Sequence, residues 1–409
     1  MKAEIIAVGT EILLGDIINT NAQYLSKSLA DMGIFVYHQS VVGDNSERLM
    51  EELNSSFERS DIVITTGGLG PTTDDLTKEV GSTYFNKRLV LHKESLDKIE
   101  AFFKTLNRTL TENNKKQAYF PEDSIILDND HGTAPGCIIE DNGKILILLP
   151  GPPKENKPMF ENYVAPYLKK FQHGILASKT LRICGVGESS VATQISHIIE
   201  NQTNPTVAPY AKENEVTLRI TAKASNREEA FKLISPIESK IRDILGENIY
   251  GEGETALENV VAQMLIEKNL SLSTAESCTG GLLSGRLINY PGISEIFMDG
   301  CVTYSNEAKM KRLGVKKGTL EIYGAVSENT AIEMAEGVAR TSGTDIGIST
   351  TGIAGPGGGT DEKPVGLVYI GLYIKGNTYV KKLNFPGNRH SVRERTVTSA
   401  LDFLRRNLL

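Results

Sequence analysis

The chain has 409 residues, which is too long for one ordinary domain and predicts two or three. Its residues are 40% apolar and 23% charged, as in globular proteins, and its net charge of −7 disfavours wrapping of a nucleic-acid backbone. The longest apolar runs are only strand length, the N-terminus lacks the apolar core of a signal peptide, and the four cysteines form no metal-binding pattern. We therefore expect a soluble cytoplasmic protein with reduced thiols and no membrane contact.

Residues 1–170 alternate short apolar runs with amphipathic helical patterns. The patterns predict strands at 3–9, 34–42 and 61–68 and helices at 21–33, 46–57 and 92–106. This alternation predicts an α/β domain with a doubly wound parallel sheet and helices on both faces. The proline-rich stretch 149–160 is expected to break helix and strand and to close the domain.

Two further domains are predicted after it. Residues 175–252 form a small α+β segment, and the run 251–255 is its linker to the next domain. Residues 255–409 predict an α/β sandwich that contains an antiparallel hairpin at 365–385. It ends in a helix with an apolar stripe made of Val397, Ala400, Leu401, Leu404 and Leu408.

Polar loops follow two strands of the first domain, at 9–21 and 65–77. Ligands of such sheets bind outside the carboxyl ends of the strands. In the second loop, glycines let the backbone approach a phosphate, and Asp74 and Asp75 follow before a helix. Paired carboxylates beside phosphate-binding amides suit a Mg²⁺-type ion, although Asp74 could instead simply cap the helix.

The stretch TAESCTGG (274–281) offers three neighbouring hydroxyl or thiol groups. Ser277 and Cys278 are both candidate nucleophiles: a thiol at a helix N-terminus has a lowered pKa, but small buried cysteines usually only pack. Thr279 suits a helix N-cap. Gly280 and Gly281 favour a tight turn whose free amides could bind an oxyanion or a phosphate.

The loops GTEILLGDIINTNAQYLSKSLADMG and TTGGLGPTTDDLT resemble the N-terminal half of the CinA family, which has the fold of molybdopterin-biosynthesis (MoCF-like) proteins. The resemblance implies a metal-dependent ADP-ribose pyrophosphatase that forms AMP and ribose 5-phosphate. It implies a divalent metal (Mg, Mn, Co or Ni), with K⁺ as a further cation. The implied metal ligands are Asp75, Asp44, Glu11 and Asp74, and the implied substrate contacts are Gly67, Gly68 and Gly70. Because the fold also hosts binders, the alternative is a nucleotide- or molybdopterin-binding protein with one or both activities lost.

TAESCTGG, VTYSNEAK, TTGIAGPGGG and EKPVG occur in this order within 255–409 and resemble the C-terminal domain of the same family. In its stand-alone form that domain is a nicotinamide-nucleotide amidase, which deamidates nicotinamide mononucleotide (NMN) without a cofactor. The resemblance implies Ser277 as nucleophile, Lys309 as its base and Tyr304 as support. The substrate contacts expected here are Thr279, Gly280, Gly281, Thr351, Gly352, Arg389 and Arg393.

A lysine base makes a physical demand, because an ordinary pKa near 10.4 leaves only about 0.04% of the amine neutral at pH 7. Burial or a nearby positive charge must therefore lower that pKa. We expect Arg389 and Arg393 to lie beside Lys309, where they would lower its pKa and hold the substrate phosphate.

The middle segment resembles the KH-like domain of full-length CinA proteins. Nucleic-acid-binding KH domains use a GXXG loop, whereas the nearest stretch here reads CGVGES and the chain is acidic. We therefore expect no nucleic-acid binding, a spacer or dimerisation role for this segment, and a homodimer.

Overall fold

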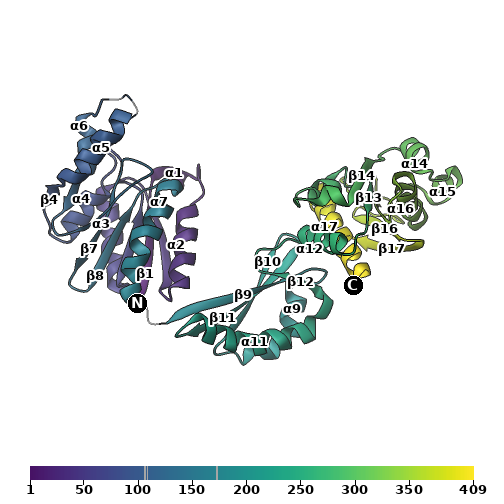
Figure 1. Cartoon of the computed structure of the whole chain (residues 1–409), viewed down its shortest axis with the longest axis horizontal. Coiled ribbons are helices and arrows are strands. Elements are labelled where there is room, and N and C mark those ends of the chain that lie inside the picture. The colour runs from purple at the N-terminus through teal and green to yellow at the C-terminus, as the bar shows by residue number, and fades with distance from the viewer. Residues whose placement is uncertain (106, 108, 172–173) are drawn as a thin grey trace. The chain divides into compact units, whose positions relative to one another are not determined.

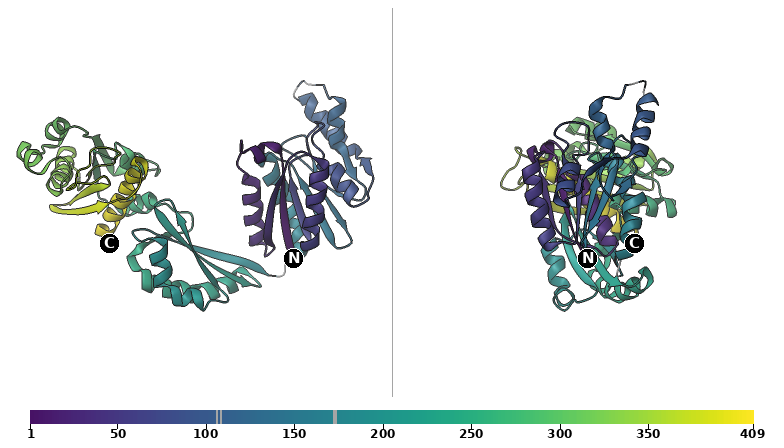
Figure 2. Two further views of the ribbon diagram at one scale, coloured as in Figure 1. Left: turned by 180° about the vertical axis from the view of Figure 1, so that it is seen from behind. Right: turned by 90° about the vertical axis from the view of Figure 1, so that its left-hand side faces the viewer.

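A computed structural model describes residues 1–105, 107, 109–171 and 174–409, which form two compact units (Figures 1 and 2). The first comprises Met1–Ala177 and Ala222–Lys232, and the second comprises Ser178–Thr221 and Leu233–Leu409. Among the helices so described, none has the length and apolar character needed to span a bilayer.

The first unit is built on a six-stranded sheet of order β2-β1-β3-β8-β7-β6. Its strands are β1 (Lys2–Val8), β2 (Phe35–Val42), β3 (Ile62–Thr66), β6 (Ile125–Leu127), β7 (Gly136–Asp141) and β8 (Lys144–Leu149). The first three strands and β8 are parallel, as predicted, but β7 and β6 are antiparallel to their neighbours. The parallel strands place all their carboxyl ends along one edge, which is where the polar loops leave the sheet.

Helices cover both faces of this sheet because alternate strand residues point to opposite sides. Ile5, Ile64 and Ile147 pack on one face and Ile6, Val63 and Leu146 on the other. The helices are α1 (Thr10–Leu14), α2 (Thr20–Asp31), α3 (Ser46–Arg59), α4 (Thr77–Tyr84), α5 (Lys93–Thr105), α6 (Glu112–Lys115), α7 (Pro153–Met159) and α8 (Ala165–Leu168), and a two-stranded sheet joins β4 (Leu89–Leu91) to β5 (Tyr119–Pro121). Leu106, the predicted last residue of the helix seen as α5, lies outside the described residues.

The proline-rich stretch 149–160 was predicted to break helix and strand, and this prediction is wrong for its second half. Helix α7 begins at Pro153, and a π-helical turn at Phe160–Val164 and α8 continue from it. Proline fits the first turn of a helix because its missing N–H has no partner there in any case.

The middle segment is a four-stranded sheet of order β10-β11-β9-β12 with three helices. Its elements are β9 (Ile175–Ile183), α9 (Glu188–Gln194), α10 (Ser196–Glu200), β10 (Thr206–Lys212), β11 (Glu215–Ala224), α11 (Arg227–Leu245) and β12 (Ile249–Glu252). Within the second unit, Asp402 accepts hydrogen bonds from the Cys184 thiol (3.0 Å) and from Arg406 Nε (2.8 Å), which joins this segment to the last helix of the chain.

Residues 257–408 form a five-stranded sheet of order β14-β13-β15-β16-β17 between two layers of helices. The strands are β13 (Leu272–Glu276), β14 (Phe297–Val302), β15 (Ile346–Gly352), β16 (Leu367–Ile374) and β17 (Asn377–Asn384); the helices are α12 (Leu257–Glu267), α13 (Leu282–Leu287), α14 (Asn306–Leu313), α15 (Lys317–Tyr323), α16 (Glu328–Ser342) and α17 (Arg389–Leu408). The antiparallel pairing of β16 with β17 confirms the predicted hairpin, and the predicted apolar stripe of α17 is buried in the core. Strands β13, β14 and β15 are parallel, so their carboxyl ends also share one edge.

Candidate active sites

The TAESCTGG stretch comprises the last residues of β13 and the sharp turn, 277–281, that leads into α13. Gly280 and Gly281 both have positive φ (61° and 95°), which side-chain-bearing residues rarely adopt, and Gly281 is the N-cap of α13. The backbone N–H of Ser277 donates to Thr350 O on β15 (2.9 Å). This bond fixes Ser277 at the carboxyl edge of the parallel strands.

Lys309 reaches Ser277 from α14, the helix that follows the neighbouring strand β14. Ser305 caps α14 by accepting from Ala308 N (3.1 Å), and Lys309 follows in the first turns of that helix. Its Nζ lies 3.0 Å from Ser277 Oγ and donates to Thr303 O (2.8 Å) and Tyr304 O (3.3 Å). Carbonyl oxygens only accept hydrogen bonds. A neutral amine at this position donates its two hydrogens to the two carbonyl oxygens, and its lone pair points toward the serine hydroxyl.

The surroundings of Lys309 favour that neutral form. The residue is 1% exposed, and burial lowers its pKa, while the neighbouring Cys278 thiol acts in the opposite direction. The expectation that two arginines lower this pKa is therefore wrong. Arg389 instead donates to Gly355 O (2.9 Å) and Tyr304 Oη (3.1 Å), and Arg393 donates to Thr279 O (2.7 Å).

A cavity of about 200 Å³ opens in front of the Ser277–Lys309 pair. Three of the residues that line it, Ala325, Val326 and Ala354, were not named by the sequence analysis. The other lining residues were candidates already: Ser277, Cys278, Tyr304, Lys309, Thr351, Gly352 and Arg389. The sequence did not single out the Ala325–Val326 wall. Lys363 of the EKPVG motif supports it by donating to Tyr323 O (2.6 Å) and Val326 O (2.8 Å).

Thr279, Gly280, Gly281 and Arg393 were predicted to contact substrate, but none lines this cavity. Thr279 is fully buried, and its hydroxyl bonds to Thr350 Oγ1 (2.6 Å). The interpretation of Thr279 as the helix cap is also wrong, because α13 starts at Leu282. The two glycines of the turn move the helix start two residues further along the chain.

Glu276 is a residue of the turn that sequence reasoning missed. Its buried carboxylate accepts from the backbone N–H groups of Gly281 (2.9 Å), Leu283 (3.1 Å) and Ser284 (2.8 Å), and from the Ser284 hydroxyl (2.6 Å). The start of α13 therefore already has an anion, and the Gly281 amide is not free for an oxyanion or a phosphate as expected. The sequence signal for this role was the position of Glu276, an acidic residue a few positions before the start of α13.

Cys278 shares the cavity with Ser277 but has a different electrostatic environment. It is 6% exposed, and burial raises the pKa of its thiol to about 12. A thiol is a nucleophile only as its thiolate, which this environment suppresses at neutral pH. Between the two candidate nucleophiles, the structure favours Ser277.

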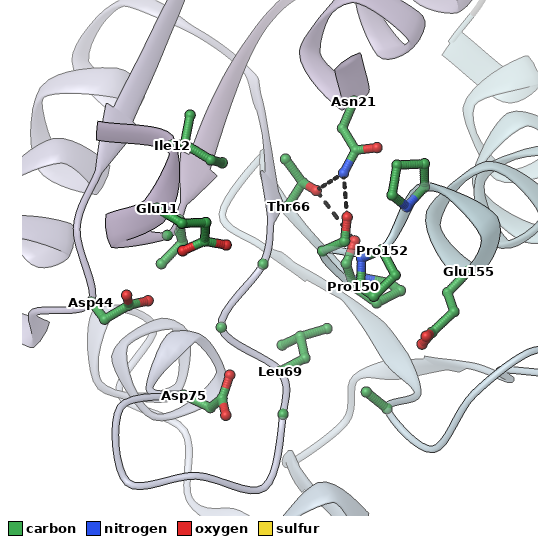
Figure 3. Close-up of a pocket in the computed structure, with 18 of the residues that line it drawn as sticks. Glu11, Ile12, Asn21, Asp44, Thr66, Leu69, Asp75, Pro150, Pro152 and Glu155 are labelled. Carbon is green, nitrogen blue, oxygen red and sulfur yellow. Dashed lines mark hydrogen bonds between the residues drawn. The ribbon is translucent and has the colours of Figure 1, made fainter. Parts of the chain in front are cut away.

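The first unit has a larger cavity, of about 600 Å³, at the carboxyl ends of its four parallel strands. The residues that line it include all those predicted for this domain: Glu11, Asp44, Asp74, Asp75, Gly67, Gly68 and Gly70. Figure 3 shows several of them around the cavity. Asn21, Gln117 and Glu155 also line it. Asn21 ends the first of the two loops but was not singled out, and Gln117 and Glu155 were missed because they lie outside both loops.

Two of the carboxylates are held by threonines. Asp44 accepts from Thr10 N (3.0 Å) and Thr10 Oγ1 (2.8 Å), and Asp75 accepts from Thr72 N (2.9 Å) and Thr72 Oγ1 (2.5 Å). In each case one carboxylate oxygen takes both bonds. Asp74 is exposed, and the start of α4 has no side-chain cap, so the capping interpretation of Asp74 is wrong.

The donor set of this cavity suits a hard cation. Its lining side chains include five carboxylates, Glu11, Asp44, Asp74, Asp75 and Glu155, and no lysine, arginine or histidine. In the described part of the chain, no three His, Cys, Asp or Glu side chains are grouped closely enough to hold a metal by themselves. A Mg²⁺-type ion needs only one or two carboxylates when substrate phosphates complete its coordination, so the residues fit that mode of binding.

The chain is 69% identical to a competence-damage inducible protein of Clostridium tetani and 64% identical to one of Clostridium acetobutylicum, each over 409 residues that cover both chains in full. The chain belongs to the CinA family. Three family models match it: a probable molybdopterin binding domain over 4–170, a damage-inducible protein CinA KH domain over 178–251 and a CinA C-terminal domain over 254–408. The exact domain boundaries given above stay a prediction.

Solved structures of CinA superfamily proteins are similar to part of the chain. One from Klebsiella pneumoniae is 37% identical and covers 37% of this chain and 95% of its own, with a TM-score of 0.37. One from Escherichia coli is also 37% identical and covers 40% of this chain and 98% of its own, with a TM-score of 0.37. The fold of this CinA protein thus combines a MoCF-like domain, a KH-like middle domain and a CinA C-terminal domain.

Replacing Glu276 tests its role in shaping the turn. Glu276→Ala leaves three backbone N–H groups and a hydroxyl without their acceptor, so we expect the free energy of unfolding to fall by about 2–3 kcal/mol. Urea unfolding measures this change. Glu328→Ala is the matched control, because it removes an exposed acid from the first turn of α16 and should change stability by less than about 0.5 kcal/mol. Equal losses in both variants would contradict the assignment.

Proposed function

We propose that the C-terminal domain hydrolyses the carboxamide of NMN to nicotinate mononucleotide and ammonia. The observation that carries this proposal is the 3.0 Å contact between Ser277 Oγ and the buried amine of Lys309. A serine beside a desolvated lysine is a known form of activated nucleophile, in which the amine replaces the usual histidine.

The geometry supports a two-step reaction. Neutral Lys309 takes the proton of Ser277 Oγ as the oxygen attacks the carboxamide carbon, and the protonated amine then delivers that proton to the leaving nitrogen. Ammonia departs and leaves an acyl group on Ser277. Water, deprotonated by the same amine, attacks the acyl carbon and releases the carboxylate, and Ser277 regains its proton.

The cavity fits the reacting end of the substrate better than the whole mononucleotide. Its volume of about 200 Å³ is below the roughly 300–1,000 Å³ of typical ligand pockets. The nicotinamide ring would lie against Ala325, Val326 and Ala354, with the carboxamide toward Ser277. Arg389, fixed at the cavity by Gly355 and Tyr304, is the cation available for the phosphate.

We further propose that the N-terminal domain hydrolyses ADP-ribose to AMP and ribose 5-phosphate. The supporting observation is the lining of its cavity by five carboxylates without a basic side chain, because such a site repels a pyrophosphate unless a cation is bound. Asp75, with Asp44 or Glu11, would hold that cation, with Asp74 at the edge. A divalent ion held there would supply the positive charge that neutralises and polarises the pyrophosphate.

The glycine loop between β3 and α4 positions these groups. A Cβ on Gly67 would lie 2.1 Å from Val8 O, and a Cβ on Gly68 would lie 2.1 Å from Thr77 Oγ1. Only glycine permits this close packing, which brings the loop backbone and Asp75 to the cavity. The alternative for this domain is a nucleotide- or pterin-binding protein without turnover, and the metal experiment below separates the two.

Three variants test the nucleophile and base of the amidase. We expect Ser277→Ala and Lys309→Met to lower the rate of ammonia release from NMN by about 10³-fold or more, because each removes one member of a unit that acts together. Cys278→Ala is the matched control next to Ser277 and should keep a rate within about threefold of the wild type. Activity lost only in Cys278→Ala would contradict the serine assignment, and a wild type that releases no ammonia would contradict the function.

The pH dependence tests the state of Lys309. The base acts in its neutral form, and its pKa is below the usual 10.5. We therefore expect kcat/KM for NMN to rise with pH and to level off below the usual lysine range, as measured by ammonia release across that range. A rate that still rises at pH values above the ordinary lysine pKa would contradict a lysine base with a lowered pKa.

Metal removal tests the N-terminal activity and has an internal control. We expect chelation with EDTA to abolish AMP formation from ADP-ribose and Asp75→Asn to lower it by about 10²-fold or more, because the negative cavity then cannot neutralise the pyrophosphate. Ammonia release from NMN by the same samples should not change. AMP formation that persists in EDTA would refute the metal-dependent mechanism, and no AMP formation with any divalent metal would favour the binding protein.

A further inference from the structure

The large cavity of the first unit has two chemically different sides. Figure 3 shows Glu11, Asp44 and Asp75 on one side, where the proposed function places the metal and the pyrophosphate. The opposite side, here called the far side, consists of Asn21, Pro150, Pro152 and Glu155. The proposed hydrolysis leaves the far side without a role.

Glu155 is held in place on the far side by a loop. One carboxylate oxygen, Oε2, accepts from Asn129 Nδ2 (2.8 Å), and the same Asn129 nitrogen donates to Ala134 O (3.0 Å). A Cβ on Gly132 would lie 2.2 Å from Oε2, so the loop lies directly on the carboxylate. Glu155 thus presents a fixed group that only accepts hydrogen bonds, at a position that lines the cavity.

Asn21 lies in the wall of the same cavity. Its Nδ2 donates to Thr66 Oγ1 (2.8 Å) and Gly151 O (2.7 Å). The backbone oxygen of Gly151 can only accept a hydrogen bond, so the side-chain nitrogen of Asn21 must face it, and this fixes the orientation of the amide. Asn21 Oδ1 is buried without a partner among the described residues. Because this oxygen is not exposed to the cavity, the role of Asn21 is to brace the wall next to Thr66 and Gly151.

We propose that the far side binds the ribose of the AMP half of the substrate, with Glu155 accepting hydrogen bonds from its 2′,3′-diol. This inference rests on the proposed nucleotide substrate. A carboxylate is the group that dinucleotide-binding proteins use for a ribose 2′-hydroxyl, because it accepts and never donates. The rings of Pro150 and Pro152 and the Leu69 side chain line the cavity and give an apolar surface for the adenine base. The ribose 5-phosphate half has no such base, so the far side suits the AMP half.

Binding of AMP and 2′-deoxy-AMP, measured by calorimetry on the full chain with Mg²⁺, tests this assignment. We expect the wild type to bind AMP about tenfold more tightly than 2′-deoxy-AMP, as for a hydrogen bond to a charged acceptor. In Glu155→Ala this ratio should fall to about one. Glu155→Gln keeps an acceptor for Asn129 and should give an intermediate ratio. This variant shows whether the effect of Glu155→Ala comes from the lost carboxylate or from a rearrangement of the loop that carries Asn129. Glu161→Ala, which removes a nearby acid bonded to Tyr24, is the matched control and should keep the wild-type ratio.

The outcomes separate this inference from the proposed hydrolysis. Equal binding of both nucleotides by the wild type, or an unchanged ratio in Glu155→Ala, overturns the ribose assignment even if ADP-ribose is hydrolysed. A ratio that depends on Glu155 in a protein that does not hydrolyse ADP-ribose supports the ribose site and overturns the pyrophosphatase. If neither AMP nor 2′-deoxy-AMP binds, both the site and the nucleotide substrate are refuted.

Discussion

The burial of one amine determines how the C-terminal site is built. Lys309 Nζ is removed from water and held by two backbone carbonyl oxygens, so its charged form loses hydration and its pKa falls. The carbonyls belong to Thr303 and Tyr304, which follow β14, and the serine follows β13. The two strands are parallel neighbours, and their shared carboxyl edge therefore brings the proposed nucleophile and base together. The Ser305 cap then sets where α14 starts and hence where the amine points.

The two cavities use opposite electrostatic principles with the same sheet geometry. In the C-terminal cavity, burial disfavours the charged form of the Lys309 amine. The amine is therefore neutral, and able to accept a proton, at a lower pH than an exposed lysine. The N-terminal cavity instead is lined by five carboxylates, and hydrogen bonds from threonines fix the orientation of two of them. In the proposed function, the C-terminal site supplies its own base, whereas the N-terminal site needs a bound cation before it accepts an anionic substrate.

Periodicity in the sequence predicted the elements that bury a continuous apolar face, such as the α17 stripe and the β16–β17 hairpin. It also located the polar loops at the strand ends, and with them Ser277 and Asp75, whereas Lys309 was indicated only by the resemblance to the CinA family. It could not give the direction of β7, which depends on strand pairing, or the true start of α13, which depends on Gly281 taking a left-handed conformation. Glu155 was hidden because a proline-rich segment indicates a break, although proline also starts helices.

Each cavity is lined by residues of a single unit. Residues 8–155 supply the whole lining of the large cavity, and residues 277–389 supply the whole lining of the small one. Neither set of side chains borrows a group from the other unit, so the chemistry of one site needs no shared catalytic residue. The lining of neither cavity therefore requires that the two domains be fused in one CinA chain. Any advantage of the fusion must come from the substrates the sites use, and both proposed substrates are nucleotides that carry a ribose phosphate.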